Sequence, residues 1–541
     1  MIGKHGACRD ILLRALPHRI LAAALALLLA PALPAAAQDR LAAGESLALR
    51  LDPARPVQLR IEAPPGSYLA GRIEAGAQPV DAALLTAEGA HFRQLAQQDR
   101  GAIRFQAMSE GEAMILRLSG AGETRVALDQ LVAPADLQPP APDYLSPRMA
   151  ALAETLAQGG DTAGFWRAVA AEGTPLVEEA EAGEVVLTFL WRGAQRNVRL
   201  FGGPSSDHDW LDRLGDSDVW FKSFRVPRAT RLSYKLAPDV PDLPGNARAR
   251  RMAILATAQM DPLNRHPWPA EAPDRFNQHA TLTLPQAPPQ PGTPPAPEAD
   301  PAMRRVVFDS PTLGNSRELL IAHPRDFDPA DPRLVLALIF DGERALAEMQ
   351  APQMLDTLTR QGRLPPVLAV LIPSIDGMTR ARELPGNDAF ADALADELLP
   401  LIAVETGITP DPARTVLAGA SYGGLAAATV ALRRSDRFGN ALSMSGSFWW
   451  APQGSASDGT PHVAAEFAAR ERLPIRFFLS AGSFETSRHG GDGILQTSRS
   501  LRDILLLKGY AVDWREYAGG HDYLVWRGAL ADGLIALFGA R

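Results

Sequence analysis

The 541-residue sequence almost lacks cysteine: Cys8 is the only one. Cys8 lies in an N-terminal stretch with the features of a removable leader. Without that stretch the chain has no thiol, so it can form no disulfide and carry out no thiol chemistry. Cysteine catalysis and disulfide-stabilised folds are therefore excluded.

The sequence also lacks an excess of positive charge. Its formal net charge is −8, and the leader carries four basic residues and one acidic residue, so its removal leaves about −11. Nucleic acids are bound mainly through Lys and Arg at phosphates, and the negative balance disfavours them as partners. An anionic ligand would need a local basic patch.

Long apolar runs are missing, with one short exception at Ile20–Ala30. A membrane-spanning helix needs about 20 apolar residues, so this run is too short for stable membrane insertion. The run follows a basic region and precedes small residues, as in a secretory signal peptide. The sequence therefore predicts a signal peptide over residues 1–37, cut after Ala37, and a periplasmic or secreted protein.

Two proline-rich stretches, 134–148 and 286–302, resist both helix and strand and are interpreted as linkers. They divide the chain into three parts. Short alternating apolar runs predict an accessory β-sandwich over 39–133 and a second β domain over 149–285. Over 303–541, apolar strands alternate with amphipathic helices, which predicts an α/β domain with a mostly parallel sheet.

The segment Thr415–Ala426 reads TVLAGASYGGLA and places Ser421 among glycines just after an apolar run. This pattern is typical of a nucleophile elbow, in which a strand turns sharply into a helix and exposes the serine hydroxyl. A plain glycine-rich turn is the alternative, so the surrounding motifs have to decide.

The later motifs follow the order of an α/β-hydrolase triad, which is serine, acid, histidine, each after a strand. Glu485 follows the strand expected at 476–479, and His521 follows the strand that ends near Tyr517. His521 would act as general base and a carboxylate would orient it. Asp492, in the same loop as Glu485, is the alternative acid, and Asp522 is expected to cap the next helix.

Backbone N–H groups for an oxyanion hole are expected at two places. One is Tyr422, directly after the nucleophile, and the other is Gly342 or Glu343, after the strand expected at 334–340. His489, Asp492 and His521 lack the spacing of a metal site, so no metal and no cofactor are expected.

Candidate substrate-binding residues lie on two other loops that follow strands. Arg380 and Arg382 could meet an anionic substrate, with an ion pair to Glu383 as the alternative. Trp449 and Trp450 could form a ligand wall, with a place in the core as the alternative.

From about Phe165 to the C terminus the chain resembles the enterochelin (enterobactin) esterase family. The resemblance rests on blocks from both expected domains: VLTFLWRG (Val186–Gly193), LPPVLAVLIPSIDGMTRARELPGNDAF (Leu364–Phe390), AGASYGG (Ala418–Gly424), FGNALSMSGSFWW (Phe438–Trp450) and GGHDYLVWRGAL (Gly519–Leu530). It implies a β domain followed by an α/β-hydrolase domain, and a serine esterase acting on a tricatecholate siderophore such as ferric enterobactin. It also implies that Arg380 contacts the substrate. With the 39–133 module, the expected fold is an α/β-hydrolase domain after two β-sandwich-like domains.

The leader and the 39–133 module depart from the usual cytoplasmic enzyme of this family, so we expect a periplasmic esterase that acts during siderophore import. Two other functions stay open. One is a general carboxylesterase or acyltransferase of the same fold, and the other is a non-catalytic siderophore-binding protein.

Overall fold

The structure is a computed structural model that describes residues 39–137, 143–181, 183–204, 208–455, 459–488 and 491–539. The expected signal peptide lies outside these residues. The chain divides into two compact units, Met1–Pro142 and Asp143–Arg541. In the part of the chain that the structure describes, no helix is long and apolar enough to cross a membrane.

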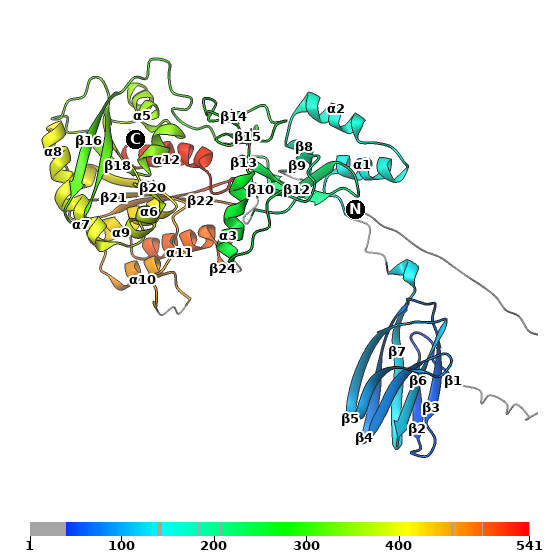
Figure 1. Cartoon of the computed structure of the whole chain (residues 1–541). Coiled ribbons are helices and arrows are strands. Elements are labelled where there is room, and N and C mark those ends of the chain that lie inside the picture. Colours follow the sequence, from blue (N-terminus) through cyan, green and yellow to red (C-terminus); the bar gives the residue numbers. More distant parts are fainter. Residues whose placement is uncertain are drawn as a thin grey trace, which may run out of the picture. The chain divides into compact units, whose positions relative to one another are not determined.

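The first unit is a β structure folded around one long strand, β4 (Tyr68–Thr86), which pairs along its length with β5 (His91–Met108) (Figure 1). The first part of β4 also pairs with β7 (Gly122–Val132) and its last part with β6 (Ala113–Gly120). The remaining strands are β1 (Asp39–Arg40), β2 (Ser46–Leu51) and β3 (Val57–Glu62), and a 3-10 turn, η1 (Pro134–Asp136), follows. Alternate side chains of these strands enclose an apolar core that includes Leu59, Ile73 and Leu116.

The second unit begins with two sheets packed face to face around Phe189, Leu232 and Tyr234. One sheet has the order β10 (Val198–Gly202), β13 (Arg231–Pro238), β15 (His279–Thr283), β14 (Pro267–Trp268). The other has the order β11 (Asp212–Arg213), β12 (Val219–Pro227), β9 (Glu184–Arg192), β8 (Leu176–Glu179). The short elements around them are α1 (Pro147–Ala157), α2 (Ala163–Glu172), α3 (Ala247–Met252) and η2 (Ala253–Ala256). We call this part the β domain.

The rest of the second unit is a mostly parallel sheet, with an antiparallel pair at one edge. Its order is β16 (Ala302–Ser310), β17 (Asn315–His323), β19 (Val367–Ile372), β18 (Val335–Phe340), β20 (Thr415–Ala420), β21 (Asn440–Met444), β22 (Arg476–Gly482), β25 (Ala511–Tyr517). A small separate hairpin joins β23 (Ser487–Arg488) and β24 (Gly491–Asp492). We call this part the hydrolase domain.

Helices cover both faces of the hydrolase sheet, as the apolar runs of its strands require. One face packs against α7 (Asp388–Ala393), the π-helical η3 (Leu394–Leu398), α8 (Leu399–Thr406), α9 (Tyr422–Arg433), α10 (His462–Ala469) and α11 (Ile494–Leu507). The other packs against α4 (Gly342–Ala347), α5 (Ala351–Arg360) and α12 (Tyr523–Phe538). Two short elements, α6 (Gly377–Glu383) and η4 (Pro412–Arg414), lie in connections. The layers are visible in Figure 1.

The two proline-rich stretches differ in part from the linkers that the sequence predicts. Pro147 already starts α1, because proline suits the first helical position, and the Ser146 hydroxyl accepts a hydrogen bond from Met149 N at 3.1 Å. The second stretch packs on the hydrolase domain: Gln290 Oε1 accepts from Arg527 Nε at 2.9 Å, and Ala296 N donates to Thr357 Oγ1 at 3.0 Å. Proline-rich sequence here makes an ordered irregular segment.

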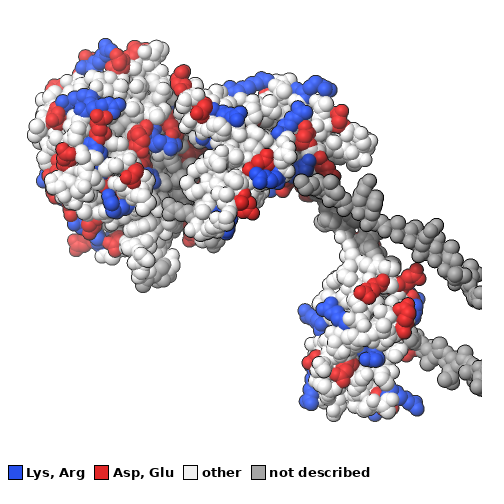
Figure 2. Space-filling view, in the orientation of Figure 1, with Lys and Arg blue, Asp and Glu red and all other residues white. Residues whose placement is uncertain are grey.

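Acidic and basic side chains are interspersed on the face of the molecule shown in Figure 2. Neither sign gathers into a broad patch there. This face therefore offers a charged ligand no broad patch of opposite sign.

Candidate active site

Ser421 stands on the sharp turn between β20 and α9. Its backbone has φ 58° and ψ −120°, a conformation that L residues rarely adopt and that costs free energy unless the surroundings enforce it. The backbone of Ser421 is held by hydrogen bonds from its N–H to Met444 O at 3.0 Å and from Ser447 N to its carbonyl at 3.1 Å. This is the geometry expected of a nucleophile elbow.

The glycines of the elbow allow the strand and the helix to touch. A Cβ on Gly419 would lie 2.6 Å from the backbone of Gly423, and a Cβ on Gly424 would lie 2.7 Å from Ser443 Oγ. Both distances are shorter than real contacts, so these positions need glycine because of close packing rather than because of their dihedral angles.

Glu485 and His521 form a hydrogen-bonded pair at the ends of β22 and β25. Glu485 Oε1 lies 2.6 Å from His521 Nδ1, and Glu485 Oε2 accepts a hydrogen bond from Gly482 N at 2.6 Å. The carboxylate side chain is 4% exposed, whereas the imidazole is 41% exposed. The buried partner thus orients the ring and leaves the rest of the ring accessible.

The alternative acid, Asp492, is not at this position. It lies in β24, is exposed, and its backbone pairs with that of Ser487 in the small hairpin. Glu485 is therefore the acidic residue of this loop that contacts His521.

Ser421 and His521 line one cavity of about 430 Å³ between the hydrolase domain and the β domain. The hydrolase domain supplies most of the other lining residues: Asp341, Glu343, Arg344, Glu348, Arg380, Asp522, Tyr523 and Trp526. The β domain supplies Phe201, Ser233, Trp268 and His279. The hydroxyl of Ser421 lies 3.3 Å from that of Ser447, which is buried.

Trp526 packs against the imidazole of His521. The two rings meet edge to face with centroids 4.6 Å apart, and Trp526 Nε1 donates to Ser445 Oγ at 2.9 Å. The indole is itself buried, so it limits the positions that the imidazole can take.

The two expected oxyanion donors are both at helix starts. Tyr422 is the first residue of α9 and Gly342 the first of α4, and the first N–H groups of a helix have no partner within it. Glu343 lines the cavity, and its carboxylate accepts from Ser374 N at 3.1 Å. A role of these N–H groups in catalysis stays a prediction.

The expected substrate-binding residues separate in the structure. Arg380 lines the cavity and forms an ion pair with Asp341 at 2.6 Å. Arg382 is 65% exposed and lies 4.0 Å from Glu383, and it is not among the lining residues. The position of Arg382 thus matches the alternative of an ion pair with Glu383 at the surface.

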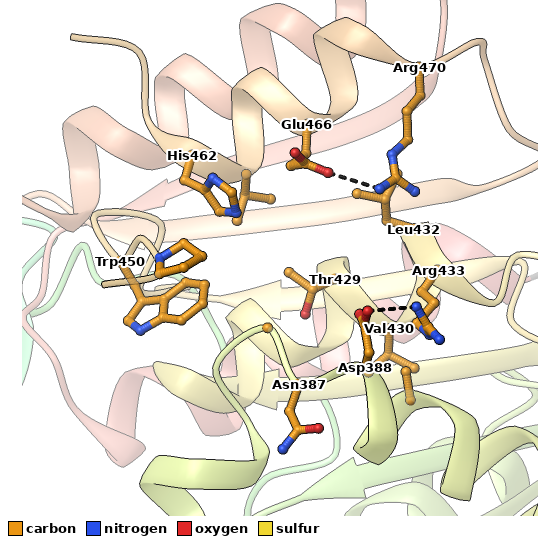
Figure 3. A pocket seen from close by; sticks show the side chains of 14 residues that line it. Asn387, Asp388, Thr429, Val430, Leu432, Arg433, Trp450, His462, Glu466 and Arg470 are labelled. Carbon is orange, nitrogen blue, oxygen red and sulfur yellow. Dashed lines mark hydrogen bonds and ion pairs between the residues drawn. The ribbon is translucent and has the colours of Figure 1, made fainter. Parts of the chain in front are cut away.

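The two tryptophans also lie outside the residues that line this cavity. Trp449 packs on Tyr422, with ring centroids 6.1 Å apart. Trp450 turns toward a separate, smaller pocket, where it faces His462 (Figure 3). The charged groups around that pocket pair with one another, as Asp388 does with Arg433 and Glu466 with Arg470. Neither tryptophan is among the residues that line the cavity of Ser421, and a contact of either with a ligand stays a prediction.

Burial shifts the pKa of several groups that line the cavity. Burial first, and then the charges of Lys235 and Arg344, lower the pKa of His279 to about 3, so this imidazole is neutral near pH 7. Burial also raises the pKa of the Asp522 and Glu348 carboxyl groups. Among the described residues, no group of three or more His, Cys, Asp or Glu side chains is arranged to hold a metal ion.

Sequence reasoning missed the contribution of the β domain to this cavity. Phe201, Ser233, Trp268 and His279 lie far from the elbow in the sequence and share no motif with it. Three other lining residues could have been found from the sequence, because they lie within a few residues of Gly342 or His521: Arg344, Tyr523 and Trp526. By contrast, Asp522 caps α12 as expected, accepting from Leu524 N at 2.7 Å.

Two family models match the second unit. The model described as "Enterochelin esterase, N-terminal" matches residues 186–293, and the model described as "Putative esterase" matches residues 310–537. The iron(III) enterobactin esterase of Dickeya dadantii is 34% identical over 419 residues, which cover 70% of this chain and 92% of that protein. The chain belongs to the enterochelin esterase family.

Other relatives support the same family. The iron(III) salmochelin esterase of Escherichia coli is 30% identical over 72% of this chain and 98% of its own length. The crystal structure of the ferric enterobactin esterase from Salmonella typhimurium, at 32% identity, covers 69% of this chain and 98% of its own, with a TM-score of 0.56. The crystal structure of the Shigella flexneri enterobactin esterase in the presence of enterobactin is 31% identical and has a TM-score of 0.55. It covers 69% of this chain and 97% of its own. The expected fold class is thereby confirmed, and the protein is an ester hydrolase.

Proposed function

We propose that this protein is a serine esterase that cleaves the ester bonds of a tricatecholate siderophore such as enterobactin, iron-loaded or free. The observation that supports it most is the convergence of Ser421 and the Glu485–His521 pair on one cavity. The substrate class comes from the relatives, whose names state iron(III) enterobactin and iron(III) salmochelin.

The chemistry follows from the groups at the cavity. His521 takes the Ser421 hydroxyl proton through Nε2 while its Nδ1–H donates to Glu485, and Oγ attacks the ester carbonyl carbon. The N–H groups of Tyr422 and of Gly342 or Glu343 stabilise the oxyanion. The tetrahedral intermediate then collapses to an acyl-enzyme, and the leaving alcohol takes the proton from His521. Water hydrolyses the acyl-enzyme by the same steps, with His521 again as the general base.

Ester cleavage explains how iron would be loosened without reduction. Three catechols on one scaffold bind iron at high effective concentration, and cutting the scaffold makes the binding partly intermolecular and weaker. No cofactor enters these steps.

The test is to incubate the protein and Ser421→Ala with enterobactin and with its ferric complex, and to separate the dihydroxybenzoylserine products by chromatography. Ser500→Ala, on α11, is the matched control, since it removes a hydroxyl that donates to Gln496 O of the same helix at 3.1 Å. Products should form with wild type and Ser500→Ala and be absent with Ser421→Ala. A protein that binds the ferric complex without forming products would be a binding protein, and one that prefers simple nitrophenyl esters would be a general carboxylesterase.

We further propose that the esterase works in the periplasm or outside the cell. The support is the sequence of residues 1–37, with its basic start, its apolar run and three alanines before Gln38. Sequencing the N terminus of the protein from a periplasmic extract should give Gln38 as the first residue. Recovery from the cytoplasm with residues 1–37 intact would contradict this location.

A further inference from the structure

Asp522, the residue after His521, joins the hydrolase domain to the β domain. Its Oδ1 accepts from Leu524 N at 2.7 Å and caps α12, while its Oδ2 accepts from Ser233 N, in β13. Asp522 is 8% exposed, and charged acceptors make hydrogen bonds about twice as strong as neutral ones. One carboxylate thus binds both the start of α12 and an interior strand of the β domain.

The loop that carries His521 has further contacts to the β domain. Arg231 N donates to Ala518 O at 2.9 Å. A Cβ on Gly520 would lie 2.9 Å from Gly203 O, so this loop and the turn after β10 are in direct contact. On its other side, Gly519 O accepts from Phe484 N at 3.1 Å, beside Glu485. The loop is therefore enclosed between the β domain and the loop of the acid.

We infer that Asp522 is a positioning residue for catalysis, through which the β domain fixes the place of the His521 imidazole between Glu485 and Ser421. In this role the β domain orients a catalytic residue in addition to lining the cavity. The inference rests on the proposed serine–histidine chemistry. Displacing a catalytic group by about 1 Å can cost about a hundredfold in rate, so a loop released from β13 should lower turnover even for a substrate too small to reach the β domain.

Asp522→Ser separates this role from helix capping. Serine caps a helix about as well as aspartate, but its single short oxygen cannot reach both Leu524 N and Ser233 N. With p-nitrophenyl acetate, we expect kcat to fall about tenfold or more while KM stays within about twofold. Labelling of Ser421 by a fluorophosphonate should slow by the same factor. The thermal midpoint should fall, because Ser233 N loses its buried acceptor, so the rates are compared at a temperature where the variant is folded.

Gly520→Ala tests the same contact without altering Asp522, since the added methyl group pushes against Gly203 O. We expect the same loss in kcat with unchanged KM, and this variant decides the matter if Asp522→Ser does not fold. Asp503→Asn is the control: this carboxylate on α11 pairs with Arg502 at 2.7 Å, within the hydrolase domain. It should keep wild-type kcat.

Wild-type kcat and labelling rates in both folded variants, or a loss confined to KM, would overturn the inference. Failure of the proposed serine chemistry has a different outcome, because Ser421→Ala would then be as active as wild type. Failure of the proposed substrate would appear as a preference for p-nitrophenyl acetate over enterobactin in the wild-type protein. If p-nitrophenyl acetate is turned over too slowly to measure, the labelling rate of Ser421 gives the same comparison.

Discussion

Arg380 binds Asp341 through two parallel hydrogen bonds, from Nε to Oδ1 at 2.6 Å and from Nη2 to Oδ2 at 2.7 Å. Asp341 is 4% exposed and has a left-handed backbone, with φ 52°. It directly precedes Gly342 and Glu343, the expected oxyanion donors. Arg380 thus supports the turn that places these donors, in addition to any contact it makes with substrate.

Arg380→Ala should destabilise the protein, because it leaves the Asp341 carboxylate buried without its charged partner. Breaking a buried pair in this way costs about 3–5 kcal/mol, and less for Arg380 because its side chain is 27% exposed. Urea unfolding measures the change. Adding Asp341→Asn should recover part of the stability, and Arg382→Ala should stay within about 0.5 kcal/mol of wild type. An Arg380→Ala protein of unchanged stability with a raised KM for the siderophore would make the arginine a substrate contact alone.

Glu485→Gln should lower kcat by a factor of about 10² to 10⁴, since the amide cannot stabilise the imidazolium and can favour the wrong tautomer of His521. Steady-state kinetics on enterobactin and on p-nitrophenyl acetate should show the same factor. Asp492→Asn provides the comparison within the same loop and should keep kcat within about twofold, because surface changes seldom act at a distance. A large loss in Asp492→Asn with none in Glu485→Gln would reverse the assignment of the acid.

His279 should make the second unit less stable in acid. Its pKa is about 3 in the folded protein against about 6.5 when unfolded, so between these values the unfolded state binds more protons. The free energy of unfolding therefore falls as pH drops from about 6.5 toward 3, by at most about 1.4 kcal/mol per pH unit from this group. Urea unfolding at pH 7 and pH 5 should show a smaller difference in His279→Phe than in wild type. The exposed His266→Gln should retain the wild-type difference, and an unchanged difference in His279→Phe would contradict the prediction.

A protein that begins at Asp143 should fold and keep its esterase activity, because the first compact unit ends at Pro142 and the catalytic cavity is lined by residues of the second unit. We expect kcat/KM for enterobactin within about threefold of the full chain, as for domains that fold independently. Circular dichroism and product analysis measure the two properties. Loss of activity in a folded shortened protein would assign the first unit a part in catalysis or in binding the substrate.

The sequence predicted those parts of the site that depend on a strand end and a short motif. Ser421 has the elbow geometry, and Glu485 and His521 follow the strands after which they were expected and contact each other. Sequence spacing could not choose between Glu485 and Asp492, since both follow β22. The choice depends on the hairpin β23–β24, in which Asp492 is exposed, whereas Glu485 contacts His521.

What depends on contact between distant segments could not be predicted. Trp268 and His279 reach the cavity because one sandwich sheet packs against the His521 loop, and no local pattern encodes that contact. Trp450 follows a strand as expected, but its indole packs against Gly386 and lines another pocket. A Cβ on Gly386 would lie 2.7 Å from the indole, so this packing depends on the missing side chain of the glycine. Local sequence gives the loop, whereas the packing of neighbouring elements gives the direction of its side chains.

The close approach of Gly419 to Gly423 has a consequence for how such enzymes can diversify. A Cβ on Gly419 would lie 2.6 Å from the backbone of Gly423, so no side chain can be added at Gly419 without separating the strand from the helix on either side of Ser421. Phe201 and Trp268, on the β domain, line the same cavity and lie outside this glycine contact. Changes in the range of accepted esters would therefore accumulate on the β domain, while the reacting oxygen keeps its position.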